Sequence, residues 1–396
     1  MTPLYTHQKR FLARDPDKAM LVWSMGSGKT RVACEWAKRR EPVVIICPKG
    51  LKENWRRECE MWGLKEYRII SKEEFKKRAR ELSQKVVIVD EADAFFSANF
   101  KSQLSKALKW YINTHKPHLL LLSGTPLRSS AWNIYTAATL LGHTWNYRDF
   151  QWRFFSQVQM GFRLVPVPRA GTEEELRKLI ESISDVFRLE DEFDIPPQID
   201  ETIYTGESKA QKHAHERNIE IAPIVRFTRD HQIEAGIGVM EKDDTKLELI
   251  QQYALDVPKV AVVCRYRAQL ETYAAALRRK GHTVYEMHGD VQNRSQVLDN
   301  VENEERCVLL CQSATCEGWE APSVGLMVFA STDYSYRNYV QMKGRILRVN
   351  RLKKNVYIHF LAGKADKAVM GAIERKQDFD VLKYYKNYQL NLDTAL

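Results

Sequence analysis

The stretch that decides the fold is Ser24-Met25-Gly26-Ser27-Gly28-Lys29-Thr30, which follows the apolar run Ala19 to Val22 and opens a helical pattern. Glycines let the backbone turn tightly, so that several N–H groups point at one phosphate cluster, and the following helix N-terminus adds positive charge. Lys29 would reach the β- and γ-phosphates, and the Thr30 hydroxyl would bind Mg²⁺. Trp23 replaces the first glycine of the usual pattern. We predict a nucleotide site; the alternative is a glycine-rich turn that only joins strand to helix.

An acidic run follows a second apolar segment. Val86 to Val89 leads directly into Asp90-Glu91-Ala92-Asp93. Because the carboxyl ends of parallel strands form one crevice, this run is expected to face the phosphate loop. Asp90 suits a magnesium ligand, since Mg²⁺ prefers hard oxygens and keeps several waters. Glu91 can polarise the water that attacks the γ-phosphate. Without the phosphate loop, an exposed acidic loop would be the simpler interpretation.

Short apolar runs alternate with helical patterns along most of the chain. Such runs are typical of strands covered on both faces, and repeated β-α units indicate a parallel sheet. The first group of predicted strands comprises Ala19 to Val22, Val43 to Cys47, Val86 to Val89 and Leu119 to Leu122. The second comprises Val260 to Cys264, Thr283 to Tyr285, Cys307 to Leu310, Val324 to Phe329 and Val356 to Phe360. Predicted helices include 51–62, 267–280, 294–304, 335–348 and 364–377. The pattern predicts an α/β protein with two parallel-sheet lobes in tandem.

Composition narrows the class of protein. The chain has 396 residues, with 61 Lys and Arg against 51 Asp and Glu, a net charge of +10. This surplus makes a polyanion the expected partner, although it also serves solubility. No apolar run approaches the length needed to cross a bilayer, and the N-terminus has no signal-peptide core. Seven cysteines without paired C-x-x-C spacing predict reduced thiols. We expect a cytoplasmic location and no membrane partner, with a nuclear location as the alternative.

With these residues in view, the chain resembles a superfamily 2 helicase or translocase. The resembling segments are His7 to Arg10 (the adenine-reading glutamine element), Ile46 to Lys49 with Leu51, Asn54 and Trp55 (motif Ia), Ser123 to Pro126 (motif III), Val262 to Tyr266 (motif IV), Glu317 to Trp319 with Ala321-Pro322 (motif V) and Gln341 to Arg348 (motif VI). Within that superfamily, Ile195-Pro196-Pro197 and the element Tyr285 to Asp290 are most similar to the Swi/Snf-like branch. Large insertions and accessory modules are not recognisable, so the chain resembles a bare motor core of the kind also found in phages and bacteria.

The resemblance implies a RecA-like fold and divides the chain into four parts. These are an ATP-binding lobe (1–140), a helical and aromatic insertion with linker (141–205), a second lobe with motifs IV to VI (206–365) and a C-terminal helical tail (366–396). The second lobe has no glycine-lysine loop, so we expect it to deliver arginines to ATP held by the first. Arg345 and Arg348 lie three residues apart on the predicted helix and would share one face. Such an arginine contributes about 10³ to 10⁵ in rate.

The predicted function is an ATP-dependent nucleic-acid motor, a helicase or double-stranded DNA translocase, that uses ATP and Mg²⁺. We expect a monomer acting on duplex DNA; RNA is the alternative polymer. There are two rival classes of protein: a small-molecule kinase with a phosphate loop, and a nucleic-acid binder that has lost its motor activity. The predicted catalytic residues are Lys29, Asp90, Glu91, Gln341, Arg345 and Arg348, with Thr30 and Asp90 on the metal. The predicted nucleotide-binding residues are Gln8, Met25, Gly26, Ser27, Gly28, Lys29, Thr30 and Arg31. The predicted nucleic-acid contacts are Lys49, Trp55, Thr125, Arg128, Arg265 and Ser313.

Overall fold

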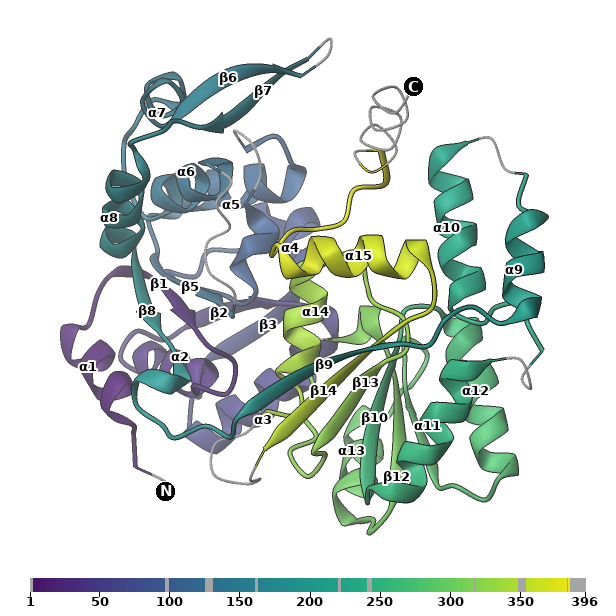
Figure 1. The fold of residues 1–396 in the computed structure, drawn as a ribbon. Coiled ribbons are helices and arrows are strands. Elements are labelled where there is room, and N and C mark those ends of the chain that lie inside the picture. The colour runs from purple at the N-terminus through teal and green to yellow at the C-terminus, as the bar shows by residue number, and fades with distance from the viewer. Residues whose placement is uncertain are drawn as a thin grey trace. The chain divides into compact units, whose positions relative to one another are not determined.

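The structure is a computed structural model, and it consists of two units, Met1–Phe193 and Asp194–Leu396. It describes residues 3–96, 100–124, 131–160, 163–219, 222–240, 244–316, 318–347, 354–382 and 384. The division between the units falls inside the segment 141–205. Each unit contains one sheet of six strands, all parallel, with helices beside it (Figure 1). The predicted fold of two parallel-sheet lobes is therefore confirmed.

The first unit carries its sheet in the strand order β3-β2-β4-β5-β1-β8. Its strands are β1 (Lys18–Trp23), β2 (Val43–Cys47), β3 (Tyr67–Ser71), β4 (Val86–Val89), β5 (His118–Ser123) and β8 (Ser184–Phe187). Its helices are α1 (Thr6–Arg14), α2 (Lys29–Ala37), α3 (Lys52–Trp62), α4 (Lys72–Arg78), α5 (Gln103–His115), α6 (Ala131–Leu140), α7 (Tyr147–Phe154) and α8 (Glu173–Ile183). A separate antiparallel hairpin, β6 (Phe155–Met160) and β7 (Arg163–Pro168), lies between α7 and α8. The segment expected to be a helical insertion thus also contains strands.

The second unit carries its sheet in the order β11-β12-β10-β13-β14-β9. Its strands are β9 (Gln198–Tyr204), β10 (Lys259–Cys264), β11 (Val284–Met287), β12 (Cys307–Gln312), β13 (Leu326–Phe329) and β14 (Asn355–Leu361). Its helices are α9 (Lys209–Glu216), α10 (Pro223–Glu234), α11 (Thr245–Asp256), α12 (Arg267–Arg279), α13 (Arg294–Asn303), α14 (Tyr336–Lys343) and α15 (Lys364–Glu374).

Strand β10 shows why the apolar runs are continuous. Val260, Val262 and Cys264 belong to one buried cluster, together with side chains of α11 and α12. Ala261 and Val263 belong to a second cluster, which includes side chains of α13 and α14. Successive side chains of a strand point to opposite faces, so a sheet with both faces covered needs apolar residues at every position. The burial of both faces fixes the position of the strands, and therefore of the strand ends at which the candidate site lies.

All seven cysteines are unpaired and buried, as their spacing predicted. Among the described residues, no helix combines the length and the apolar character needed to span a bilayer.

Candidate active site

The phosphate loop lies between the end of β1 at Trp23 and the start of α2 at Lys29. Gly26 and Gly28 both have left-handed backbones, with φ of 75° and 79°. Only glycine adopts this region without a steric cost, so the two glycines are what allow the chain to reverse into the helix. Gly28 is the N-cap of α2 and accepts the hydrogen bond from Val32 N–H. The first N–H groups of α2 therefore point into the loop, where a phosphate is favoured.

Lys29 lies within this loop. Its Nζ donates to the carbonyl oxygens of Trp23 at 2.7 Å and Ser24 at 3.1 Å. The end of β5 lies close by, because a Cβ added at Gly124 would be 3.8 Å from Nζ and 3.6 Å from Met25 Cγ. The ammonium group is therefore held at the carboxyl edge of the sheet, within the loop that the sequence predicted to bind nucleotide.

Two side chains from α1 support the loop from beneath. Nε2 of His7 and Nε2 of Gln8 lie 2.9 and 3.1 Å from the carbonyl oxygen of Ser27. The Gln8 Oε1 accepts from Tyr5 N–H at 3.0 Å, and a Cβ at Gly28 would come within 2.3 Å of Gln8 Nε2. The structure therefore places the Gln8 amide nitrogen against the phosphate loop, while its oxygen binds the N-cap of α1. Its adenine-reading role stays a prediction.

Residues near the end of the first unit form hydrogen bonds with α1 and with the end of β1. Glu192 accepts from the backbone N–H of Thr6 and His7, and its Oε2 lies 2.7 Å from His7 Nδ1. Although burial raises the pKa of Glu192, these hydrogen bonds hold it down at about 2. Trp23 stands where the usual phosphate-loop pattern has its first glycine. Its indole N–H donates to Asp185 Oδ1 of β8 at 2.7 Å. Glu192 and Asp185 were missed because nothing in the sequence links residues so far apart.

The acidic pair lies where β4 ends. Asp90 Oδ2 accepts from the Trp55 indole at 2.9 Å, and Oδ1 accepts from the backbone N–H of Glu91 at 2.9 Å. Burial, and then the charge of Glu91, raises the pKa of Asp90 to about 6, while Trp55 and Lys29 act to lower it. Glu91 itself has a left-handed backbone, with φ of 49°. This conformation is strained for a non-glycine residue; such strain often marks functional sites, and in this chain it also occurs at helix C-caps such as Asp15 and Lys116.

The strand register brings the two halves of the site together. Val22 of β1 pairs with Ser123 of β5, and Leu121 of β5 pairs with Val89 of β4. The phosphate loop and the acidic pair therefore follow strands on either side of β5, at the same edge of one sheet. Hard oxygens from Asp90 and Thr30 fit the preference of Mg²⁺ for such ligands.

Two predicted contacts of the first unit take other partners. Trp55, predicted as a nucleic-acid contact, is 1% exposed, and its indole donates to Asp90, so the structure places this side chain in the core. The reason is the amphipathic pattern of α3, which turns this position toward the sheet. Arg31 lies with its guanidinium 4.2 Å from the Trp62 ring centroid and donates to Pro3 O at 3.1 Å. Lys49 is exposed at the start of a 3₁₀ turn after β2. Thr125 and Arg128 lie outside the described residues.

In the second unit, predicted nucleic-acid contacts converge on an aspartate. Arg265 Nη1 lies 3.1 Å from Asp333 Oδ1, and the Ser313 hydroxyl donates to Asp333 Oδ2 at 2.7 Å. The Arg265 guanidinium also lies 3.5 Å from the Tyr334 ring centroid. These residues follow β10, β12 and β13, whose ends share one edge of the sheet. Asp333 was missed, although an acidic residue soon after a buried strand is the same signal that marked Asp90.

The motif VI segment differs from the predicted helix 335–348. Helix α14 ends at Lys343, and Arg345 N–H bonds to Met342 O in a tight turn. Gly344, which favours helices poorly, is the C-cap. Arg345 therefore does not continue the helix, and the predicted helix 335–348 is wrong beyond Lys343. Arg348 itself lies outside the described residues.

The two other motif residues make local contacts. Arg345 Nη1 donates to the carbonyl oxygen of Trp319 at 2.8 Å. Gln341 is fully buried, with its Oε1 3.1 Å from the Cys316 Sγ. Motifs V and VI therefore hold each other within the second unit. The action of Gln341 and Arg345 on a nucleotide stays a prediction.

Comparison with known proteins finds a family match for residues of the second unit. Residues 245–350 match the family model described as helicase conserved C-terminal domain. The chain is 26% identical over 207 residues to the ATP-dependent RNA helicase DBP3 of Yarrowia lipolytica, covering 51% of this chain and 38% of that protein. It is 27% identical over 180 residues to the protein of the same name from Meyerozyma guilliermondii, covering 45% of this chain and 32% of the relative. The chain thus spans about a third of the length of these relatives.

These likenesses support the resemblance to a superfamily 2 helicase. They do not support the narrower likeness to the Swi/Snf-like branch, because the relatives are named RNA helicases.

Proposed function

We propose that this protein is an ATP-dependent nucleic-acid motor, a helicase, and that its polymer is RNA. The observation that carries the proposal is the placement of Lys29 and Asp90 at one edge of an all-parallel sheet, on strands that flank β5. Ligands of open parallel sheets bind at this edge. The second sheet, with its match to a helicase C-terminal domain, has no reason to exist in a small-molecule kinase.

In the proposed reaction the loop holds the triphosphate of ATP, with Lys29 on the β- and γ-phosphates. Thr30 and Asp90 would hold Mg²⁺, which neutralises the charge that develops on the phosphate oxygens. Glu91 would orient the attacking water and accept its proton. Gln341, Arg345 and Arg348 would come from the second unit and sense the γ-phosphate. Hydrolysis would then depend on the two units acting together.

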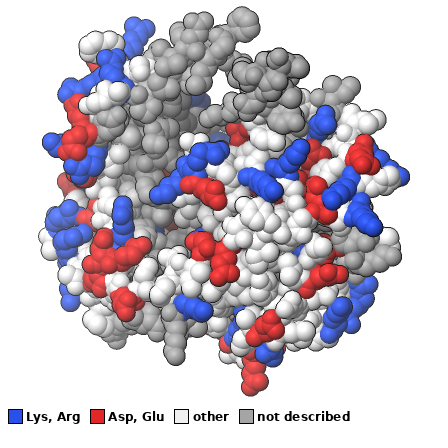
Figure 2. Space-filling view, in the orientation of Figure 1, with Lys and Arg blue, Asp and Glu red and all other residues white. Residues whose placement is uncertain are grey.

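The choice of RNA rests on the comparisons. The relatives are named ATP-dependent RNA helicases, and this favours RNA over the duplex DNA that the Swi/Snf-like resemblance implied. Charge alone does not distinguish the two polymers, because both are read through their phosphates. On the face drawn in Figure 2, Lys and Arg are interspersed with Asp and Glu. Binding on that face would therefore depend on individual residues rather than on one broad basic patch.

The test is the rate of ATP hydrolysis with single-stranded RNA, duplex RNA, single-stranded DNA or duplex DNA. We expect stimulation of several-fold or more by RNA. Lys29→Ala should weaken ATP binding, and Glu91→Gln should preserve binding while blocking turnover. A rate that no nucleic acid changes would contradict the motor. Stimulation by duplex DNA alone would keep the motor and overturn the choice of RNA.

Arg265 provides a test of the nucleic-acid surface. Its position at the end of β10, beside the Ser313 hydroxyl, suits a phosphate contact. Arg265→Ala should weaken RNA binding about equally across sequences and lower the slope of log K against log salt by about 1. The matched control is Arg279→Ala, an exposed arginine at the other end of α12. An equal effect of both variants would remove the specific role of Arg265.

A further inference from the structure

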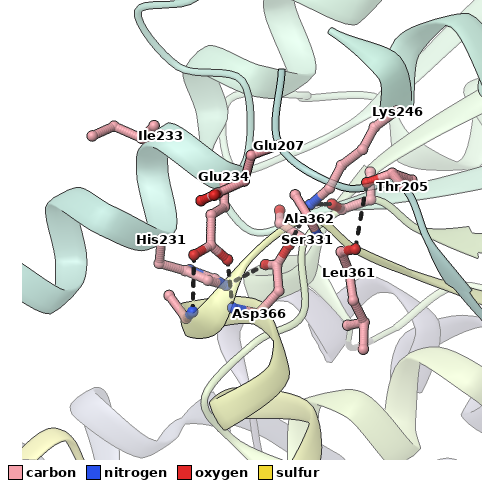
Figure 3. Close-up of polar contacts among 12 residues, drawn as sticks. Thr205, Glu207, His231, Ile233, Glu234, Lys246, Ser331, Leu361, Ala362 and Asp366 are labelled. Carbon is pink, nitrogen blue, oxygen red and sulfur yellow. Dashed lines mark hydrogen bonds and ion pairs between the residues drawn. The ribbon is translucent and has the colours of Figure 1, made fainter. Parts of the chain in front are cut away.

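A second cluster of ligand-type side chains lies in the second unit, away from the strand ends described above. Glu207 precedes α9, His215 lies on α9 and Glu234 lies at the end of α10. One carboxylate oxygen of each glutamate and a ring nitrogen of the histidine all lie within 4.8 Å of one another. Figure 3 shows the carboxylates of Glu207 and Glu234 close together.

The position of His215 is set by its other ring nitrogen. Nδ1 lies 2.9 Å from Asp230 Oδ1, and that carboxylate is itself fixed by the Asn218 amide at 2.7 Å. With Nδ1–H donated to Asp230, Nε2 presents its lone pair 2.9 Å from Glu207 Oε1. A histidine whose far nitrogen is bound by a carboxylate is the usual arrangement of a metal ligand.

The glutamates are arranged as ligands of unequal burial. Glu234 is 1% exposed, and its oxygens accept the backbone N–H of Ala365 at 2.9 Å and Asp366 at 2.7 Å, at the start of α15 (Figure 3). Each oxygen keeps a further lone pair. A Cβ added at Gly363 would come within 2.5 Å of Glu234 Oε1 and 2.6 Å of Glu207 Oε1. The two carboxylates therefore converge on one small space that only glycine leaves open.

A positive charge among these lone pairs would be electrostatically favoured, in addition to the cations of Lys212, Arg226 and Lys364 that line the adjoining cavity. Like charges disfavour each other, and a buried charge is costly unless it is paired or binds a metal. A single proton on His215 satisfies Glu207 and Asp230 but adds no bond to Glu234. Imidazole and carboxylate ligands together suit Zn²⁺, whose bonds of about 2.0 to 2.2 Å place tetrahedral ligand atoms about 3.3 Å apart. The three ligand atoms, which all lie within 4.8 Å of one another, are close to this spacing.

From this geometry we propose that Glu207, His215 and Glu234 form a Zn²⁺ site, with Asp230 orienting the histidine. The site opens on a cavity of about 410 Å³, which leaves room for water as a fourth ligand. Lys212, Arg226 and Lys364 also line this cavity, and they favour an anionic fourth ligand over a second cation. Bound Zn²⁺ would tie α9, α10 and the residues before α15 together. This role is independent of ATP hydrolysis.

Zn²⁺ binding is measured on the full chain, stripped with chelator, by titration calorimetry without nucleotide. We expect one equivalent of Zn²⁺ to bind, and millimolar Mg²⁺ not to displace it. Co²⁺ in its place should give visible absorption bands of low coordination number. His215→Ala and Glu207→Gln should each weaken Zn²⁺ binding at least about tenfold, and Asp230→Asn about 10- to 100-fold.

Two controls separate this site from other zinc binding. His213→Ala removes an exposed histidine of the same helix and should leave the affinity unchanged. Asp90→Asn should also leave it unchanged, which distinguishes the site from the proposed nucleotide metal. Glu207 is partly exposed and Gln has its shape, so this variant tests the site without loss of fold, as circular dichroism would verify. No saturable binding of one equivalent, or wild-type affinity in His215→Ala and Glu207→Gln, would overturn the proposal.

Discussion

The hydrogen bond from Trp55 to Asp90 should control the charge of the proposed magnesium ligand. Trp55→Phe keeps an aromatic ring at a fully buried position but removes the indole N–H, which lies 2.9 Å from Asp90 Oδ2, together with part of the ring system. This donor stabilises the ionised carboxylate, so its loss raises the pKa of Asp90 further above its already elevated value of about 6. A protonated Asp90 cannot serve as an anionic ligand of Mg²⁺.

The magnitude follows from the strength of a hydrogen bond to a charged group. Such a bond contributes about 1.5 to 3 kcal/mol, or roughly 1 to 2 pKa units, which moves Asp90 from about 6 to about 7 to 8. The ionised fraction at pH 7 then falls from about nine tenths to between about a half and about a tenth. We expect Mg²⁺-ATP to bind about 2- to 10-fold more weakly at pH 7, with no difference by about pH 9.

The assay is the ratio of wild-type to variant affinity for Mg²⁺-ATP between pH 6 and pH 9. Taking the ratio removes the titration of ATP itself. Trp110→Phe is the control, because it removes an indole from a partly exposed position on α5. A deficit of Trp55→Phe that is the same at pH 7 and pH 9 would refute the reasoning, since the indole would then act by packing and not through the protonation of Asp90.

Two further predictions concern residues that support the structure of each unit. Gly28→Ala should weaken ATP binding more than tenfold, because its Cβ would lie 2.3 Å from Gln8 Nε2. Gly63→Ala is the control, because Gly63 has a similar φ and no atom within 4 Å of an added Cβ. Measuring ATP binding and thermal unfolding of both variants separates the effect of the contact with Gln8 from that of backbone strain. Lys246→Met should lower the free energy of unfolding by about 3 to 5 kcal/mol, because it leaves the buried carboxylate of Asp366, now 2.6 Å from Lys246 Nζ, without its cation. Urea unfolding measures the loss, and a change below about 1 kcal/mol would contradict a stabilising role for the pair.

The parts of the fold that the sequence predicted are those buried on both faces. The predicted segments that became β1, β2, β4, β5, β10 and β12 are continuous apolar runs, and the structure confirms them within a residue or two at each end. Strands β3, β8 and β9 were missed. β3 and β8 mix buried with partly exposed residues, and in β9 every residue is at least partly exposed. All three lie at sheet edges, where one side has no neighbouring strand to demand an apolar run.

The helix that ends motif VI illustrates the opposite error. Its apolar and basic spacing continues to Arg348, but the chain leaves the helix at Lys343 and forms a turn around Gly344. Spacing alone predicts which face a residue takes if the helix continues. It does not predict where a glycine and its surroundings end the helix.

By itself, the sequence determined that a glycine-rich turn with Lys29 follows a buried strand, and that an acidic pair follows another, because these are local patterns. The tertiary structure alone decided that Trp55 holds Asp90, that Asp333 joins Arg265 to Ser313, and that His215 meets Glu207 and Glu234. Each of these groupings joins residues from different elements of the chain. Their contacts depend on strand order and on which helix face packs inward, and both are fixed only when the whole sheet buries its apolar surface.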